Sequence, residues 1–123
     1  MCKDIVKFLV LETKRQGITK TADRSGLKRR TITSWVYYEA LPSFANAVKW
    51  ANALGFRFNM SKEDIVASLK TFGLIKSAEV SGIKIRTIRS WLYAGIEPPL
   101  DKIEKITTAI GKPLELIKVG GCE

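Results

Sequence analysis

The sequence predicts an all-α protein built from two tandem copies of a small helical unit. Sliding the chain by 56 positions superposes residues 17–37 on residues 73–93 without a gap, and 12 of the 21 pairs are identical. Apolar residues recur at helical spacing along the chain, and glycine and proline interrupt them at intervals typical of short helices. We therefore expect two domains, residues 1–60 and 61–123, each with four to five helices and with room for short strands at the domain ends.

The first copy is predicted to begin with three short helices. The first spans Asp4–Lys14, where apolar residues share one face, and Gly17 ends it. Thr19 is predicted to be the N-cap residue of the second helix, because its hydroxyl can accept a hydrogen bond from a backbone amide in the first turn. Gly26, which tolerates a positive φ, then turns the chain into a third helix that runs to Tyr37.

The third helix has two faces of different chemistry. Ile32, Trp35 and Val36 fall at i, i+3 and i+4, which makes an apolar stripe that predicts burial. The opposite side carries cations, hydroxyls and a phenol from Arg30, Thr33, Ser34 and Tyr37, with Arg29 beside them. This second face is polar, so the hydrophobic effect does not favour its burial against other parts of the protein.

A fourth helix closes the first copy. Pro42 stops the preceding segment, Ser43 caps the new helix, and Gly55 ends it. Trp50 falls on its inward side and is predicted to join Trp35 in the core. Residues 56–60 then alternate apolar and polar, which fits either a brief strand or an extended linker.

The second copy repeats this order. Ser61 and Asp64 read as a capping box at its start, and Pro98-Pro99 breaks the chain where Pro42 does in the first copy. Helices are predicted over residues 64–71, 74–80, 84–94 and 100–110. Residues 114–119 alternate weakly and parallel residues 56–60, so the two tails could pair as an antiparallel ribbon, either within one chain or between chains.

The charge balance favours a polyanionic partner. Twenty-one Lys and Arg stand against twelve Asp and Glu, which gives a net charge of +9 and a pI near 9.8. Each phosphate that such a surface neutralises releases counterions. Residues 1–60 hold eleven basic and four acidic side chains, net +7, whereas residues 61–123 hold ten and eight, net +2. If one copy binds a polyanion tightly, the first is expected to do so.

The chain lacks the residues that several classes of function require. The chain has no His, and its two cysteines, Cys2 and Cys122, lie at opposite ends without a CxxC motif, so no zinc set or disulfide framework is expected. No catalytic constellation or glycine-rich phosphate loop is present. Neither a signal-like segment nor a membrane-spanning run occurs. We therefore expect a cytoplasmic, non-enzymatic protein that uses no metal or other cofactor.

The stretch GITKTADRSGLKRRTITSW in the first copy and FGLIKSAEVSGIKIRTIRSW in the second resemble the helix-turn-helix of the Cro and phage-repressor (XRE-type) family of DNA-binding domains. The resemblance extends over roughly 110 residues. It implies that the second helix of each motif lies in the DNA major groove, with side chains at its N-terminal end against the base edges.

Carried over residue by residue, the resemblance assigns DNA contacts in both copies. In the first copy, positions that read bases or contact the backbone fall on Thr19, Lys20, Lys28, Arg29, Arg30, Thr33 and Ser34. Apart from the resemblance, the phenol of Tyr37 near the C-terminal end of the same helix could donate to phosphate. In the second copy the assigned positions fall on Lys76, Lys84, Arg86, Arg89 and Ser90. Ile75 and Ile85 stand where the first copy has Thr19 and Arg29, so the second copy departs from the pattern.

Two functions remain open at this point. The first is a sequence-specific regulator of double-stranded DNA, a repressor or autoregulator of the phage or mobile-element kind, that reads the major groove through Lys28–Tyr38 and also Lys84–Ala94. One chain could then act as a built-in pseudo-dimer, or two chains could form a homodimer through the second copy. The alternative is a helix-turn-helix scaffold that binds a protein partner, as an inhibitor or an antitoxin does.

Overall fold

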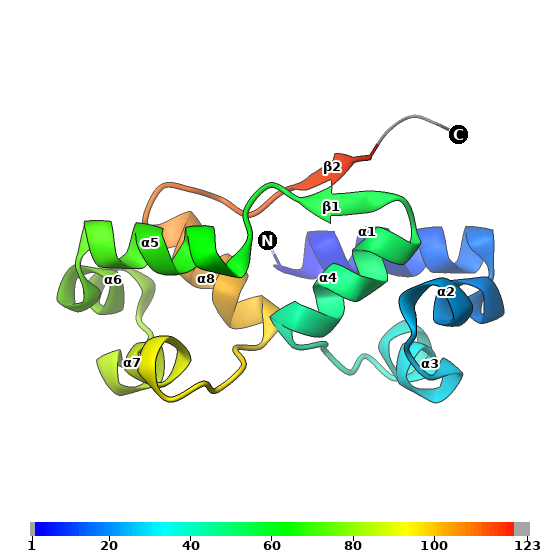
Figure 1. Ribbon diagram of the computed structural model, residues 1–123, viewed down its shortest axis with the longest axis horizontal. Helices are drawn as coiled ribbons and strands as arrows, with labels where there is room; N and C mark the ends of the chain where they lie inside the picture. Colours follow the sequence, from blue (N-terminus) through cyan, green and yellow to red (C-terminus); the bar gives the residue numbers. More distant parts are fainter. Residues whose placement is uncertain (1, 120–123) are drawn as a thin grey trace.

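The computed structural model of the chain describes the backbone of residues 2–119 and the side chains of residues 5–119. Within that range it contains eight helices and two short strands, which confirms the all-α prediction. The elements are α1 (Cys2–Gln16), α2 (Ile18–Ser25), α3 (Arg29–Tyr37), α4 (Phe44–Ala53), β1 (Phe56–Phe58), α5 (Lys62–Phe72), α6 (Leu74–Ser81), α7 (Ile85–Tyr93), α8 (Leu100–Ala109) and β2 (Leu116–Lys118) (Figure 1). We call α1 to β1 the first unit and α5 to β2 the second unit.

The N-terminus of α2 corrects one prediction, because Thr19 is not its N-cap. The helix begins at Ile18, and Gly17 occupies the cap position with a φ of 107°. A positive φ at Gly17 lets the chain leave α1 and enter α2 within a single residue, which leaves no place for a capping side chain. Thr21 instead donates its hydroxyl to the Gly17 carbonyl at 2.9 Å. Thr19 becomes the second residue of α2, and its side chain is exposed.

Two predicted helix caps are confirmed. Ser43 accepts a hydrogen bond from the Asn46 amide at 3.2 Å, directly before α4. Ser61 and Asp64 form a reciprocal capping box at the start of α5, with both bonds at 3.1 Å. Each bond satisfies a backbone amide that has no partner inside its helix, and so fixes where the helix begins.

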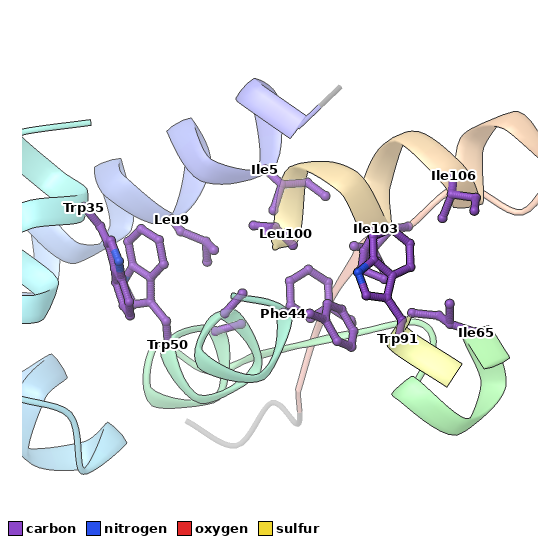
Figure 2. Close-up of a cluster of buried hydrophobic side chains, with 14 of the residues drawn as sticks. Ile5, Leu9, Trp35, Phe44, Trp50, Ile65, Trp91, Leu100, Ile103 and Ile106 are labelled. Carbon is purple, nitrogen blue, oxygen red and sulfur yellow. The ribbon is translucent and has the colours of Figure 1, made fainter. Parts of the chain in front are cut away.

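Trp35 and Trp50 form the centre of the first unit's core. Their rings lie 4.8 Å apart, and their side chains are 4% and 0% exposed, which confirms the predicted burial (Figure 2). Trp50 donates its indole N–H to Thr13 Oγ1 at 2.8 Å, and Thr13 donates to the Leu9 carbonyl at 2.7 Å. A buried indole N–H requires such a partner, since leaving it unpaired costs about 1–3 kcal/mol.

The second unit contains helices of matching length. α6, α7 and α8 have 8, 9 and 10 residues, as α2, α3 and α4 do. The positions 56 residues after Thr13 and Trp50 hold Leu69 and Ile106, both fully buried. The polar pair of the first unit is thus replaced by an apolar pair, so neither partner is left without the other.

The two units share one core. Buried side chains run without interruption from Trp35 in the first unit to Ile106 in the second, and Phe44 and Leu100 lie between them (Figure 2). α8 packs against both α1 and α4 of the first unit. Neither unit therefore has a core of its own that is separated from the other.

Two backbone pairings join the units. Ser43 and Pro99 form an antiparallel bridge, in which Phe44 N donates to Pro98 O at 2.9 Å and Leu100 N to Pro42 O at 3.1 Å. β1 and β2 form an antiparallel ribbon, with Arg57 opposite Ile117. The tails that the sequence predicted to pair do so within one chain.

Both pairings relate positions that are 56 residues apart. Ser43 faces Pro99 directly, and the ribbon register, continued by one residue, places Asn59 opposite Glu115, where Asn59 N donates to Glu115 O at 2.9 Å. An antiparallel contact between equivalent positions is the mark of a two-fold relationship. The two units are therefore arranged about an approximate two-fold axis.

One sequence expectation falls outside this description. The side chains of Cys2 and Cys122 lie outside the described residues, so the expectation that they form no disulfide framework stays a prediction. Among the described residues, no helix has the length and apolar character needed to cross a membrane.

Candidate nucleic-acid interface

The turn between α2 and α3 sets the angle of the candidate recognition helix. Gly26 adopts the left-handed conformation with φ 75°, and its amide donates to the Ala22 carbonyl, which ends α2. Ser25 Oγ accepts a hydrogen bond from Leu27 N at 3.1 Å and so holds the next residue of the turn. A side chain at Gly26 would strain this conformation, so the turn depends on glycine.

α3 presents its cations outward and its apolar stripe inward, as the sequence predicts. Ile32, Trp35 and Val36 are buried, with exposed fractions of 9% or less. Arg29 and Arg30 are the first two residues of the helix and are exposed, directly after the exposed N-cap residue Lys28.

The hydroxyl groups on α3 are more enclosed than these cations. Thr33 and Ser34 are half-buried. Ser34 donates its hydroxyl to the Thr31 carbonyl at 2.6 Å, and Ser90 does the same to Thr87 at 2.6 Å. The hydroxyl proton is used within the helix, so each serine offers a ligand its oxygen as an acceptor.

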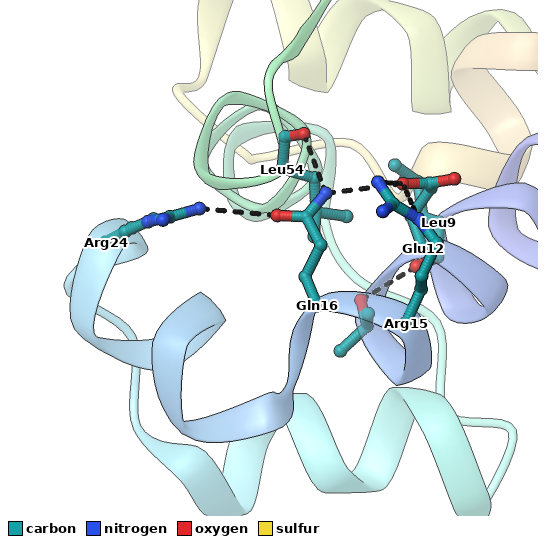
Figure 3. Close-up of polar contacts among 7 residues, drawn as sticks. Leu9, Glu12, Arg15, Gln16, Arg24 and Leu54 are labelled. Atoms are coloured by element: carbon teal, nitrogen blue, oxygen red, sulfur yellow. Dashed lines mark hydrogen bonds and ion pairs between the residues drawn. The ribbon is translucent and has the colours of Figure 1, made fainter. Parts of the chain in front are cut away.

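The start of α2 adds two exposed polar side chains, Thr19 and Lys20. A network centred on Gln16 holds this helix in place (Figure 3). Gln16 Nε2 donates to the Leu54 carbonyl of α4's C-cap at 3.1 Å, and Arg24 of α2 donates to Gln16 Oε1 at 3.3 Å. One side chain of α1 thus ties α2 to the end of α4.

Glu12 and Arg15 extend this network along α1. Arg15 donates from Nε at 3.2 Å and from Nη2 at 2.8 Å to Glu12 Oε1, and this hydrogen bonding holds the pKa of Glu12 below its ordinary value. A cleft of about 790 Å³ opens beside these residues, where Lys20, Arg24 and Lys118 of β2 are among the lining side chains. The positive surface of the first unit therefore continues past α3 to α2 and the ribbon.

Tyr37 stands at the C-terminal end of α3 with 58% of its side chain exposed. Lys14 Nζ lies 5.3 Å from the centre of its ring, a cation–π distance. The second unit repeats the pair, with Lys70 Nζ 5.6 Å from the ring of Tyr93. Sequence reasoning missed Lys14, Lys70 and Tyr93 as members of these surface pairs on α3 and α7. Extending the repeat upstream would have found the two lysines, because they are also 56 residues apart.

The second unit places its predicted residues in the same way. Lys76, Lys84, Arg86 and Arg89 are exposed, and Ser90 is half-buried. Gly82 has a φ of 76°, so the turn into α7 has the same conformation as the turn into α3. The departures are apolar: Ile75 is 67% exposed where the first unit has Thr19, and Ile85 is half-buried.

α3 and α7 lie on the same edge of the molecule. In Figure 1 both helices occupy the lower edge, at opposite ends of the long axis, with α4 and α8 between them and above. The β-ribbon lies on the opposite edge. The helices α3 and α7, which carry the exposed Arg29, Arg30, Arg86 and Arg89, therefore lie on one edge rather than on opposite sides.

Comparison with known proteins supports the prediction of a helix-turn-helix in the first unit. Residues 11–59 match a family model described as helix-turn-helix, which covers α2, α3 and α4, the end of α1 and β1. Neither the curated proteins nor the solved structures that were searched contain a match. Residues 11–59 are thus similar to the helix-turn-helix family, and α2 and α3 lie within the matched stretch.

The described residues do not form a metal-binding cluster. No group of three or more His, Cys, Asp or Glu side chains comes together within residues 5–119 in a way that would hold a metal ion. The chemistry available at the interface is cationic and hydrogen-bonding, as recognition of a polyanion requires.

Proposed function

We propose that this protein is a sequence-specific regulator that binds double-stranded DNA and places α3 in the major groove. The observation that carries the proposal is the exposed pair Arg29 and Arg30 at the N-terminal end of α3, in a region that matches the helix-turn-helix family. Helices of this motif enter the groove by that end. The proposed role is that of a cytoplasmic repressor of the phage or mobile-element kind, acting at its own promoter.

Arginine is suited to base reading at this position. A guanidinium is planar and donates two parallel hydrogen bonds, which match the O6 and N7 acceptors that guanine shows in the major groove. Arg29 and Arg30 are the first two residues of α3, and both are exposed. Both are therefore available to a duplex.

The surrounding residues supply contacts that do not depend on sequence. Thr19 and Lys20 at the start of α2, and Lys28 before α3, are exposed and can donate to phosphate oxygens. Tyr37 offers a phenol at the other end of α3. Such contacts fix the register of the protein on the duplex, and they make the affinity fall with salt concentration.

Random-site selection with the purified full-length chain tests this proposal. We expect an enriched motif, and we expect the duplex that carries it to bind more tightly than a scrambled duplex of the same length at the same salt concentration. Arg30→Ala should reduce that preference. Lys112→Ala is a charge-matched control, because the α8–β2 loop lies on the edge opposite α3 and α7 (Figure 1). Recovery of no motif, or equal loss of preference in both variants, would contradict the proposal.

A second candidate function rests on a different observation. α6 exposes two large apolar side chains, Ile75 at 67% and Val80 at 52%, where α2 carries Thr19 and Arg24. These side chains suit a protein partner better than a phosphate, so the scaffold could serve as an inhibitor or antitoxin. Absence of any enriched DNA motif would favour this function over the first.

A further inference from the structure

We infer that a single chain binds one operator composed of two inverted, non-identical half-sites, with α3 on one and α7 on the other. The inference rests on the proposed DNA-binding function and extends it to the form of the binding site. It requires three things of the structure: an arrangement that presents both helices in inverted orientation, a second reading helix equipped to contact DNA, and a difference in the side chains at the reading positions.

The arrangement follows from the two pairings between the units. Ser43 with Pro99, and Asn59 with Glu115, are antiparallel contacts between positions 56 residues apart. A two-fold axis through such contacts inverts one unit relative to the other. α3 and α7 lie on the same edge of the molecule (Figure 1), so one duplex can meet both helices, and its half-sites are read in opposite directions.

The junction between the units is built to hold this arrangement. Glu97 of the second unit accepts a hydrogen bond from the Ala45 amide in the first turn of α4 at 2.8 Å. Its other oxygen pairs with Lys62 of α5 at 3.3 Å. Together with the shared core around Phe44 and Leu100, these contacts keep the two reading helices in a fixed relation before DNA is present.

α7 carries most of the polar side chains that α3 would use to read DNA. Lys84, Arg86 and Ser90 are the same residue types as their equivalents Lys28, Arg30 and Ser34, and Arg86 is likewise exposed in the first turn of the helix. The pair of Lys70 with Tyr93 repeats the pair of Lys14 with Tyr37. α7 therefore keeps its polar face despite the apolar changes beside it.

The two helices differ at two of the reading positions. Arg29 of α3 corresponds to Ile85 of α7, and Thr33 corresponds to Arg89. Arginine matches guanine, whereas an apolar side chain in the groove matches the methyl group of thymine. At the position read by Arg29 the first half-site should hold guanine, and at the equivalent position the second half-site should hold thymine.

The two half-sites should also contribute unequally. Ile75 cannot donate a hydrogen bond to a phosphate, whereas Thr19 at the equivalent position can, and residues 61–123 have a net charge of +2 against +7 for residues 1–60. Fewer phosphate contacts mean less of the sequence-independent affinity. The half-site under α3 is therefore expected to be the more strongly enriched of the two.

Random-site selection with wild type and with Ile85→Arg/Arg89→Thr tests the inference. The double variant gives α7 the residue types of α3 at these two positions, so the selected motif should change from an imperfect to a more symmetric inverted repeat. The centres of the half-sites should be about 10 base pairs apart, so that both helices face the same side of the duplex. Guanine should replace thymine in the second half-site by roughly tenfold or more in preference.

Arg29→Ile/Thr33→Arg is the reciprocal variant, and it keeps the test decisive if Ile85→Arg perturbs folding, because Arg29 is exposed. It should make the motif symmetric in the opposite sense. Native mass spectrometry of wild type on the selected duplex should give one chain per duplex.

A single enriched half-site, two chains per duplex, or reciprocal variants that leave the wild-type asymmetry unchanged would overturn the inference while leaving the DNA-binding function in place. Failure of wild type to enrich any motif would instead overturn that function and, with it, the inference.

Discussion

Ser43 and Pro99 lie opposite each other in an antiparallel bridge, although each begins the same kind of helix in a different half of the chain. The hydrogen bonds on either side are reciprocal, from Phe44 to Pro98 and from Leu100 to Pro42. α4 and α8 therefore start side by side. This contact and the β-ribbon join the two units that carry α3 and α7.

Arg30→Ala should weaken binding to the selected site by about 1–3 kcal/mol and blur one base position, because it removes a bidentate donor. Lys20→Ala should weaken binding to selected and random duplexes by the same factor, since Lys20 is exposed and expected to contact phosphate. It should also lower the salt dependence of the affinity. Titrations of each variant with selected and random duplexes at several salt concentrations distinguish the two. Equal losses on both duplexes for Arg30→Ala would remove it from base reading.

Substitutions in α7 should cost less than those in α3. Arg86→Ala and Arg89→Ala are expected to reduce affinity for the selected duplex less than Arg29→Ala and Arg30→Ala do, because the second unit has fewer supporting phosphate contacts. All four side chains are exposed, so their removal should leave the fold intact. Competition binding with one selected duplex ranks the four variants. A larger loss in α7 would reverse the assignment of the dominant half-site.

Thr13→Val should destabilise the fold by about 1–3 kcal/mol, because the buried indole N–H of Trp50 loses its acceptor. Thr13→Ser keeps the hydroxyl and should cost less. Chemical unfolding followed by tryptophan fluorescence gives the free energy of unfolding for each variant. A larger destabilisation by serine than by valine would mean that the methyl packing, and not the hydrogen bond, is what matters at this position.

Glu12 should make stability depend on pH on the acidic side. Its pKa is lowered in the folded state by the hydrogen bond from Arg15. The stabilisation is therefore fully present above the ordinary value of 4.5 and is lost as the pH falls through the lowered folded-state pKa. Unfolding measured from neutral pH to about pH 3 should show wild type converging on Glu12→Gln as the pH falls. A difference between them that is constant with pH would contradict this assignment.

The sequence predicted the parts of the structure that depend on local pattern. The faces of α3 follow from apolar spacing, and the turn at Gly26 follows from the rarity of positive φ in other residues. The prediction of Thr19 as the N-cap of α2 was wrong, because a hydroxyl near the start of a helix does not show at which residue the helix begins. Gly17, with its positive φ, can serve both the end of α1 and the start of α2, and this moved the boundary.

The relationship between the units was beyond prediction from the sequence. Pairing of β1 with β2 within one chain, and not between chains, depends on how α8 packs on α1 and α4, which no local pattern specifies. The contacts of Glu97 could not be predicted from the sequence either. Its equivalent in the first copy is Leu41, and its partners Ala45 and Lys62 are distant in sequence. Contacts of this kind arise from tertiary packing and become visible only in three dimensions.

The β-ribbon and the Ser43–Pro99 bridge join units of one polypeptide, so dilution cannot dissociate them as it dissociates a homodimer. Occupancy of the proposed operator should then rise in simple proportion to the amount of protein at low concentrations, without the threshold that an assembling repressor shows. Covalent linkage also frees each reading helix to change alone, because a substitution in α7 is not copied into α3. Arg29 and Ile85 are an instance of such independent change.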